Sequence, residues 1–508
     1  MNTYSTMKRV GLLVIGMLAL NSNAADHWNQ FRGPNGAGSG SGFSPPVELA
    51  ESKIAWNVNV PEGMASPVIW ENQLYVVGLE EGRFKTVALS SGKGALLWEL
   101  KLPEVTLGKV HRAGHQVAST PCADEKGIYV YFGPFGMVSY DHSGKERWRK
   151  RLPLPKSMYG MSTSPIVRDG RVYLVLDDDT NLEGSRLSRS RVICLNAGTG
   201  EMIWETARPY NRSGWSTPVI WDAAEKSELI VLGNGRAYGY DLKSGEERWY
   251  VNGFSRETIA VPVIGDGRVY LSVSRQGGWG EEEIDPVPFW ISVLPFDQDG
   301  DGRIGKNEIG KDFTVPFRPE LPIGHPGFGF PLPDDPAKRK ERQLKLFQWR
   351  DKNGDGFWTR EEFISDMQVG RGRPNLSAVK PGGLGDVTET HVDWTLRSGI
   401  PEIPSPLFYE GHLYLLRAGG LLTCVDADTG KVIYKERLDA PGHYSASPVA
   451  AGGRLYLTSS TGVVTVVKAG KEFEKVHQMD LATEINATPA MDGDSFYVRT
   501  KTGLTAFR

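Results

Sequence analysis

Cysteine is scarce in this sequence: there are 3 in 508 residues, and no two are adjacent. Cys194 and Cys424 occupy equivalent positions in a repeated pattern described below, and Cys122 follows a proline that opens one repeat. Equivalent positions of separate repeats lie far apart in space, so no disulfide framework is expected. We predict that all three thiols are buried as small side chains. A Cys-x-x-Cys-His motif for haem attachment is also missing.

Excess positive charge and long apolar runs are missing too. Lys and Arg number 58 against 61 Asp and Glu, a net charge of -3, which argues against a nucleic-acid partner. Residues 1–24 combine basic Lys8 and Arg9, an apolar run from Val10 to Leu20 and small residues ending at Ala24, a pattern typical of a secretory signal. The run is too short to cross a bilayer. We therefore expect a periplasmic or secreted protein, cleaved near Ala24, without a membrane span.

What the sequence contains instead is a β-rich unit, repeated along the chain. Each copy opens with a proline, preceded by Ser or Thr except at Pro262, and continues as β-like runs separated by turn residues. Successive openers lie about 40 to 54 residues apart, the length of one four-stranded propeller blade, except where an insert separates Pro262 from Pro406. The openers are Pro67, Pro121, Pro165, Pro218, Pro262, Pro406, Pro448 and Pro489.

A turn followed by a tryptophan recurs downstream of the openers, as in Asn196, Gly200 and Trp204. The last repeat ends at Arg508 without its tryptophan, whereas an N-terminal run near residues 54–60 carries Trp56. That run would complete the last blade and remove two open edges. The sequence therefore predicts an all-β, eight-bladed β-propeller, built from residues 25–274 and 391–508.

These features resemble the pyrroloquinoline-quinone-like (PQQ-like) repeat family. The resemblance rests on the Ser-Pro openers, the Thr-Gly-x-x-x-Trp turns and the Trp-x-Gln-Phe-Arg-Gly-Pro-Asn start at residues 28–35, and it covers the chain from Trp28 to Arg508 except the insert. The family includes quinoprotein alcohol dehydrogenases and the propeller lipoprotein of the outer-membrane assembly machine. The dehydrogenases hold the quinone with calcium, beneath a disulfide between adjacent cysteines. No such pair exists here, which argues against bound PQQ.

The insert, expected at residues 275–390, contains two copies of the twelve-residue EF-hand calcium loop. Loop 1 is residues 297–308 and loop 2 is residues 351–362. Each has oxygen donors at positions one, three and five, Gly at six, a backbone carbonyl at seven and Glu at twelve, which suits a hard cation that prefers oxygen ligands. The predicted calcium ligands are Asp297, Asp299, Asp301, Arg303 and Glu308 in loop 1, and Asp351, Asn353, Asp355, Phe357 and Glu362 in loop 2.

The flanks of the two loops differ. Loop 2 is expected between an entering helix from Pro336 to Arg350 and an exiting helix from Thr359 to about Met367, with Leu344 and Phe347 on the packing side of the first and Trp349 as a further candidate. Three prolines before loop 1 exclude a long regular entering helix. Met367 is the insert's one methionine, so a structural calcium site is favoured over a sensor with a Met-rich groove.

The segments that precede the openers should converge at one face of the ring, its mouth. Their polar and aromatic residues suit an anionic or sugar-like ligand, although solvated loops or side chains that plug the channel are the alternative. The candidate ligand-binding residues are His115, Tyr159, Trp215, His443 and Tyr444, and the same segments contain His111, Arg112, Arg212, Arg256, Glu257 and Asn486. Residues 177–179, three aspartates in a hairpin, are expected to form an exposed acidic turn, with a metal site as the alternative.

Two functions remain open. The first is a non-catalytic exported scaffold for binding or assembly, with calcium in its insert and a protein or glycan partner at the propeller face. The second is a quinone-dependent or other oxidoreductase, or a lyase, acting at the mouth. No catalytic residue can be assigned from the sequence.

Overall fold

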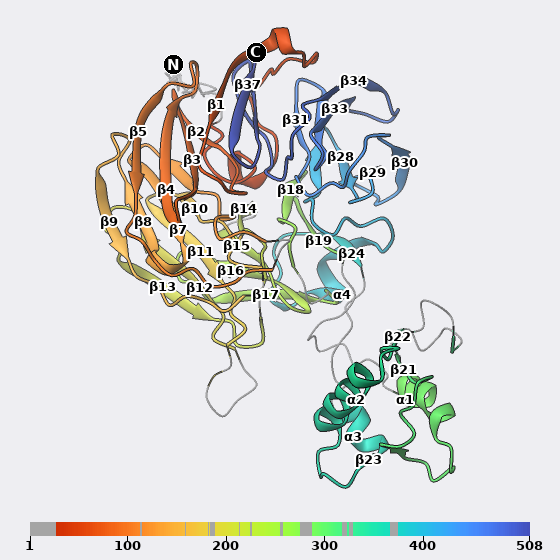
Figure 1. Ribbon diagram of the computed structural model, residues 1–508. Helices are drawn as coiled ribbons and strands as arrows, with labels where there is room; N and C mark the ends of the chain where they lie inside the picture. Colours follow the sequence, from red (N-terminus) through yellow and green to blue (C-terminus); the bar gives the residue numbers. More distant parts are fainter. Residues whose placement is uncertain are drawn as a thin grey trace, which may run out of the picture.

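The computed structural model describes residues 27–111, 114–157, 159–180, 182, 188–212, 214–223, 226–254, 258–274, 287–316, 323–324, 329–365 and 374–508. The predicted secretory signal lies outside these residues. Eight antiparallel sheets surround a common axis, as Figure 1 shows, and the eight-bladed propeller is confirmed.

The first four blades follow the chain in order, each running from an inner to an outer strand. Blade 1 has β2 (Val68–Trp70), β3 (Gln73–Glu80), β4 (Arg83–Ser90) and β5 (Leu96–Lys101). Blade 2 has β6 (Cys122–Asp124), β7 (Gly127–Phe132), β8 (Gly136–Tyr140) and β9 (Glu146–Lys150). Blade 3 has β10 (Ile166–Arg168), β11 (Arg171–Leu176), β12 (Arg191–Asn196) and β13 (Met202–Ala207). Blade 4 has β14 (Val219–Ala223), β15 (Lys226–Leu232), β16 (Arg236–Asp241) and β17 (Glu247–Asn252), and β25 (Gly385–Asp386) joins its outer edge in parallel.

The other four blades include the interrupted one and the closing one. Blade 5 has β18 (Val263–Gly265), β19 (Arg268–Val273), β24 (Asn375–Val379) and β26 (Val392–Leu396), with α4 (Thr388–His391) just before β26. Blade 6 has β27 (Leu407–Tyr409), β28 (His412–Leu416), β29 (Leu421–Asp426) and β30 (Val432–Arg437). Blade 7 has β31 (Val449–Ala451), β32 (Arg454–Thr458), β33 (Val463–Lys468) and β34 (Lys475–Asp480). Blade 8 has β35 (Ala490–Asp492), β36 (Ser495–Arg499), β37 (Gly503–Phe507) and β1 (Ile54–Asn59).

The ring is closed by β1, as the sequence predicted. β1 pairs antiparallel with β37, and Trp56 lies opposite Ala506. The first and last strands of the propeller are thus hydrogen-bonded in one sheet, which leaves neither as an open edge at the point where the chain ends meet.

The recurring turn and tryptophan join neighbouring blades. In blade 3 the side chain of Asn196 accepts hydrogen bonds from the amides of Gly198 and Thr199, which fixes the turn. Gly200 follows with a φ of 73°, and a Cβ there would lie 2.5 Å from the indole ring of Trp148 in blade 2. The indole Nε1 of Trp148 donates to the carbonyl of Ala197 at 2.9 Å. Glycine is therefore required both by the backbone angle and by the close approach of the ring.

A second set of contacts runs around the axis and explains the Ser or Thr before the openers. The backbone amide of one of these residues donates to the hydroxyl of its counterpart in the next blade, for example from Ser66 to Thr120 at 2.9 Å and from Thr120 to Ser164 at 3.0 Å. Val261 has no hydroxyl, so it cannot accept a bond of this kind. The remaining bonds run from Ser164 to Thr217, Val261 to Ser405, Ser405 to Ser447 and Ser447 to Thr488.

The N-terminal arm, residues 27–49, lies along the inner strands of several blades. Its carbonyls at Trp28 and Gly38 accept bonds from Ile69 in blade 1 and Ala450 in blade 7. The guanidinium of Arg32 is fully buried and donates to the carbonyl of Pro406 at 2.8 Å. Burial without a carboxylate partner lowers the pKa of Arg32 to about 9. The arm therefore links blades on opposite sides of the axis.

The insert enters blade 5 between β19 and β24. Its described elements are α1 (Val287–Val293), β20 (Ile304–Gly305), β21 (Thr314–Pro316), β22 (Gly329–Pro331), α2 (Pro336–Arg350), β23 (Phe357–Trp358) and α3 (Arg360–Ser365), and Figure 1 shows its helices to one side of the ring. The expected end of the insert at residue 390 is wrong, because β24 is the third strand of the blade. The segment from β24 to Trp394 is longer than in the other blades and lacks their turn signature, so the repeat pattern does not mark β24.

The ring of hydroxyl–amide bonds gives a stability prediction. Ser164→Ala removes the acceptor for the buried amide of Thr120, so the free energy of unfolding should fall by about 1 to 3 kcal/mol. Ser66→Ala is the matched control, because the Ser66 hydroxyl is buried without a partner among the described residues. Denaturant titration of both variants measures the difference. Equal losses in the two variants would contradict a stabilising role for the ring.

Candidate metal centre and the mouth of the propeller

Loop 1 is folded around its first aspartate. The carboxylate of Asp297 accepts the amide of Gly300 at 2.7 Å with one oxygen and that of Gly302 at 2.8 Å with the other. The chain turns sharply through Gly302, whose φ is 79°. These bonds hold the loop in a tight coil with the Asp297 carboxylate inside it, which is the arrangement that the glycine at position six allows.

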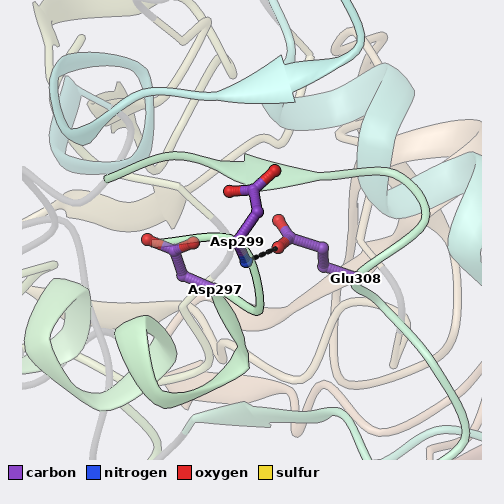
Figure 2. A group of neighbouring side chains, drawn as sticks. All are labelled: Asp297, Asp299 and Glu308. Atoms are coloured by element: carbon purple, nitrogen blue, oxygen red, sulfur yellow. Dashed lines mark hydrogen bonds between the residues drawn. The ribbon is translucent and has the colours of Figure 1, made fainter. Parts of the chain in front are cut away.

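The last acidic residue of loop 1 closes the coil from the other end. The two Glu308 oxygens accept the amides of Gln298 and Gly305, both at 2.6 Å, and the side chain is largely buried. Figure 2 shows the carboxylates of Asp297 and Asp299 beside Glu308, with the amide of Asp299 directed to Glu308. One ligand atom from each of these three residues lies within 4.8 Å of the others. Three carboxylates this close suit a divalent hard cation, which would offset their mutual repulsion.

Asp301 is held away from this cluster by its neighbour. The guanidinium of Arg303 donates to Asp301 at 2.6 and 3.0 Å, and these hydrogen bonds hold the pKa of the Asp301 carboxyl below its ordinary value. The predicted ligand at position five is therefore paired with the side chain of the residue at position seven. A cation that used Asp301 would compete with this pair.

Loop 2 repeats the hydrogen bonds of loop 1. Asp351 accepts the amides of Gly354 and Gly356 at 2.7 and 2.9 Å, as Asp297 does in loop 1. Glu362 accepts the amides of Lys352 at 3.1 Å and Thr359 at 3.0 Å, as Glu308 accepts those of Gln298 and Gly305. The two loops thus share one backbone fold, although their flanks differ.

Loop 2 differs from loop 1 at positions three and five. The Asn353 amide nitrogen donates to a carboxylate oxygen of Asp355 at 3.1 Å, and the other Asp355 oxygen accepts the amide of Phe357 at 2.9 Å. With Asn at position three, loop 2 places three carboxylates where loop 1 has four. Its lower charge means less repulsion to offset, and less attraction for a cation.

The two loops are coupled directly. Ile304 pairs with Trp358 across β20 and β23, and each stands at position eight of its loop. The guanidinium of Arg303 lies 4.0 Å from the centre of the Phe357 ring, so the residues at position seven also touch. Backbone pairing and a cation–π contact therefore join the two loops physically.

The insert has a hydrophobic core of its own. Phe347 on α2 stacks on Trp358, with ring centroids 4.8 Å apart, and Arg350 is buried over Phe363. The predicted helix from Pro336 to Arg350 is confirmed at both ends. Its expected packing side is only partly right, because Leu346 is buried while Leu344 and Trp349 are 44% and 57% exposed. The entering helix of loop 1 is short, as the prolines predicted.

At the mouth, three predicted residues form a row of aromatic rings. His111 and Tyr159 meet edge to face with centroids 4.9 Å apart, and Tyr159 meets Trp215 in the same way at 5.2 Å. The indole of Trp215 also donates to the carbonyl of Gly160 at 3.1 Å. The row comes from segments that precede three successive openers, so the convergence expected from the sequence is present here.

His115 lines a separate hollow of about 200 Å³ between blades 1, 2 and 8. Its Nε2 lies 3.6 Å from Glu62, whose carboxylate is also paired with Lys501 at 3.0 Å. Burial lowers the pKa of His115 below its ordinary value, although the Glu62 carboxylate opposes this. The imidazole is therefore neutral near pH 7, and the acidic group beside it is already paired.

Two other candidates do not belong to an open mouth. Tyr444 is fully buried in the core shared by blades 6 and 7, so it is a packing residue. His443 is held by the turn between β32 and β33, since Nδ1 lies 3.0 Å from the hydroxyl of Ser460, which also accepts the His443 amide. Arg112, Arg256 and Glu257 lie outside the described residues.

The expected acidic turn at residues 177–179 contains a buried ion pair. Asp177 is 1% exposed, and Arg208 donates to it at 3.1 Å while also bonding Tyr240 and the carbonyl of Leu232. Burial raises the pKa of Asp177, although the Arg208 charge acts in the other direction. The sequence interpretation was wrong because the partner lies 31 residues away, at the end of the outer strand β13.

Comparison with known proteins identifies the family. The sequence model described as outer membrane protein assembly factor BamB, whose repeats are PQQ-like, matches residues 83–188, 188–283 and 352–508, more than half of the chain. The chain belongs to this family. Its similarity to the BamB of Yersinia pestis is 22% identity over 366 residues, which covers 70% of this chain and 83% of that protein.

Solved structures agree on the fold. The BamB structure from Moraxella catarrhalis has a TM-score of 0.52 at 9% identity, covering 90% of this chain and 97% of its own. The quinohemoprotein alcohol dehydrogenase of Comamonas testosteroni has a TM-score of 0.53 at 13% identity, covering 96% and 81%. At this level of identity the second similarity concerns architecture alone, because one fold carries many functions.

Proposed function

We propose that this chain is an exported, non-catalytic scaffold for protein assembly, and that its insert binds two calcium ions. Membership of the BamB family carries the first part, because the relatives of that name are described as outer membrane protein assembly factors. None of the helices in the described part of the chain combines the length and apolar character needed to cross a membrane. The proposed location is periplasmic or secreted, and the proposed partner at the propeller face is a protein, with a glycan as the alternative.

The three cysteines bear on the dehydrogenase alternative. Cys122, Cys194 and Cys424 are all free and buried, in blades 2, 3 and 6. Burial raises the pKa of the Cys194 and Cys424 thiols to about 12, so both stay protonated and unreactive near pH 7. A quinone site built beneath a disulfide of adjacent cysteines cannot be assembled from these residues.

Calcium is supported by the geometry of the two loops. In each loop the first aspartate and the last glutamate already accept backbone amides from inside the coil, so little reordering is needed for ligation. The shared β20–β23 pair and the common core indicate a clamp that holds the insert folded. An ion that binds only the folded insert stabilises it by about 2.7 kcal/mol when its concentration is one hundred times Kd.

We predict that calorimetry counts two calcium sites in the mature protein. Glu308→Gln and Glu362→Gln should each remove one site, because bidentate ligation needs both carboxylate oxygens, and each should weaken the remaining site through the β20–β23 pair. Glu361→Gln is the matched control, since this exposed residue precedes Glu362 and is not at a ligand position. A chelator should lower the melting temperature of the insert before that of the propeller. Absence of binding at millimolar calcium would refute the assignment.

The oxidoreductase alternative has one observation in its favour, the row of aromatic rings beside the His115 hollow. We predict that incubation with pyrroloquinoline quinone and calcium yields neither a stoichiometric bound chromophore nor dye-linked alcohol oxidation. Absorption spectroscopy after gel filtration and a dye-reduction assay measure these outcomes. Either signal, abolished by Trp215→Ala, would favour the enzyme over the scaffold.

The scaffold function can be tested in the cell that makes the protein. Depletion of the chain should lower the amount of folded outer-membrane protein in the membrane fraction, and the depleted cell should be rescued by the full chain. Quantitative mass spectrometry of that fraction measures the change. Unchanged levels after depletion would contradict a role in assembly.

A further inference from the structure

A second cavity, of about 310 Å³, lies between the N-terminal arm and the inner strands of blades 1, 3 and 4. We call it the arm cavity. It is on the axial side of the blades, and it is distinct from the His115 hollow and from the insert. Its lining residues from the arm are His27, Asn29, Gln30, Pro34 and Asn35, and those from the blades are Trp70, Val167, Arg168 and Ile220.

The inner strands provide an internal comparison for the arm cavity. The backbone amide and carbonyl of the second residue of each inner strand point away from the neighbouring strand. In four blades this amide donates a hydrogen bond to the arm. Ile220 in blade 4 shows the pattern fully: its amide donates to the Asn35 side chain at 2.9 Å, and its carbonyl accepts from the same carboxamide at 2.7 Å. The other three are Ile69, Ala123 and Ala450.

Val167 is the corresponding residue of blade 3. It pairs with Val172 in the same register as Ile220 with Leu229, so its amide and carbonyl face the axis as those of Ile220 do. Within the described residues, neither group has a hydrogen-bond partner, and Val167 lines the arm cavity. The arm thus bonds the amide of this residue in blades 1, 2 and 4 and its carbonyl in blades 2 and 4, and it leaves both groups of Val167 free on blade 3.

The walls of the arm cavity favour a neutral ligand. Arg168 is already paired with Asp222 at 2.6 Å, so it offers little uncompensated charge. The rings of His27 and Trp70 lie in contact, with centroids 4.3 Å apart and planes inclined by 35°, and supply an aromatic wall. Gln30 is 3% exposed, and its Nε2 has no partner among the described residues, which adds an unpaired donor beside the cavity. A buried unpaired polar group of this kind is costly unless a ligand or water satisfies it.

We propose that the arm cavity binds a peptide-type amide of a partner protein, bonded to the free amide and carbonyl of Val167. A single carboxamide can accept a hydrogen bond from the Val167 amide and donate one to the Val167 carbonyl. The Asn35 side chain bonds Ile220 in this way. The chemistry can come from an extended backbone or from an Asn or Gln side chain, and stacking on Trp70 would add apolar contact. The inference rests on the proposed scaffold function in that it names the chemistry by which a partner is held.

Hydrogen exchange at single-residue resolution tests the free strand edge first. The Val167 amide should exchange faster than those of Ile69, Ala123 and Ile220, which are bonded to the arm. Asn35→Ala should raise the exchange of Ile220 to the rate of Val167, because it removes the only described partner of that amide. Equal protection of Val167 and its counterparts in the parent protein would overturn the proposal.

Three probes then test the ligand class on the full mature chain. A capped trialanine represents a backbone amide, propionamide represents an Asn or Gln side chain, and propionate lacks the N–H donor. Either amide should slow exchange at Val167, and the stronger one identifies the source, whereas propionate should have no effect. Protection by propionate, or by none of the three at high millimolar concentration, would overturn the proposal.

A pair of variants checks the position of the site. Trp70→Ala should weaken binding of the protecting amide by about tenfold, which corresponds to the stacking energy of one aromatic ring. Trp349→Ala, which removes an exposed indole from the insert, should leave binding unchanged. Equal effects of the two variants would place binding elsewhere. A failure here is distinguishable from failure of the proposed function, which is measured by calcium calorimetry and by cell depletion.

Discussion

Closure of the ring is the constraint on which the other features depend. Eight sheets that each bury two faces must meet their neighbours in a fixed order, and here three kinds of contact impose it. β37 pairs with β1, the residues before the openers are joined by hydroxyl–amide bonds around the axis, and five outer tryptophans pack on a turn glycine of the next blade. These contacts satisfy buried polar groups at the places where blades converge, where an unpaired amide would cost most.

Blade 5 shows how the ring tolerates an insertion. The insert leaves between its second and third strands, and the turn after β24 no longer offers the standard docking site to the tryptophan of blade 4. Trp249 instead donates to Glu228 of its own blade at 2.7 Å and packs against Gly239, where a Cβ would lie 2.2 Å from the indole. The segment at β25 then extends the edge of blade 4. At the interface between blades 4 and 5, the usual contact between an outer tryptophan and a turn glycine of the next blade is therefore replaced by contacts of Trp249 within blade 4 and by the pairing of β25.

The functional features lie in separate parts of this frame. Loops 1 and 2 share a core of their own and pair with each other through β20 and β23. The mouth has an aromatic row, while the opposite half of the axis holds the arm and the cavity beside Val167. A rigid ring that presents independent sites is well suited to hold partners in a fixed relation, because a change at one site need not alter another.

The sequence by itself determined the repeat, the number of blades, the closing strand and both loop motifs, because these depend on local patterns of turn residues, prolines and apolar alternation. It also anticipated three buried cysteines, which the structure confirms. Tertiary structure alone decided the return of the chain at Asn375, the burial of Tyr444, the Asp177–Arg208 pair and the free edge at Val167. Each depends on a partner distant in sequence, brought close within one blade, between neighbouring blades or by the arm. No local pattern encodes that proximity.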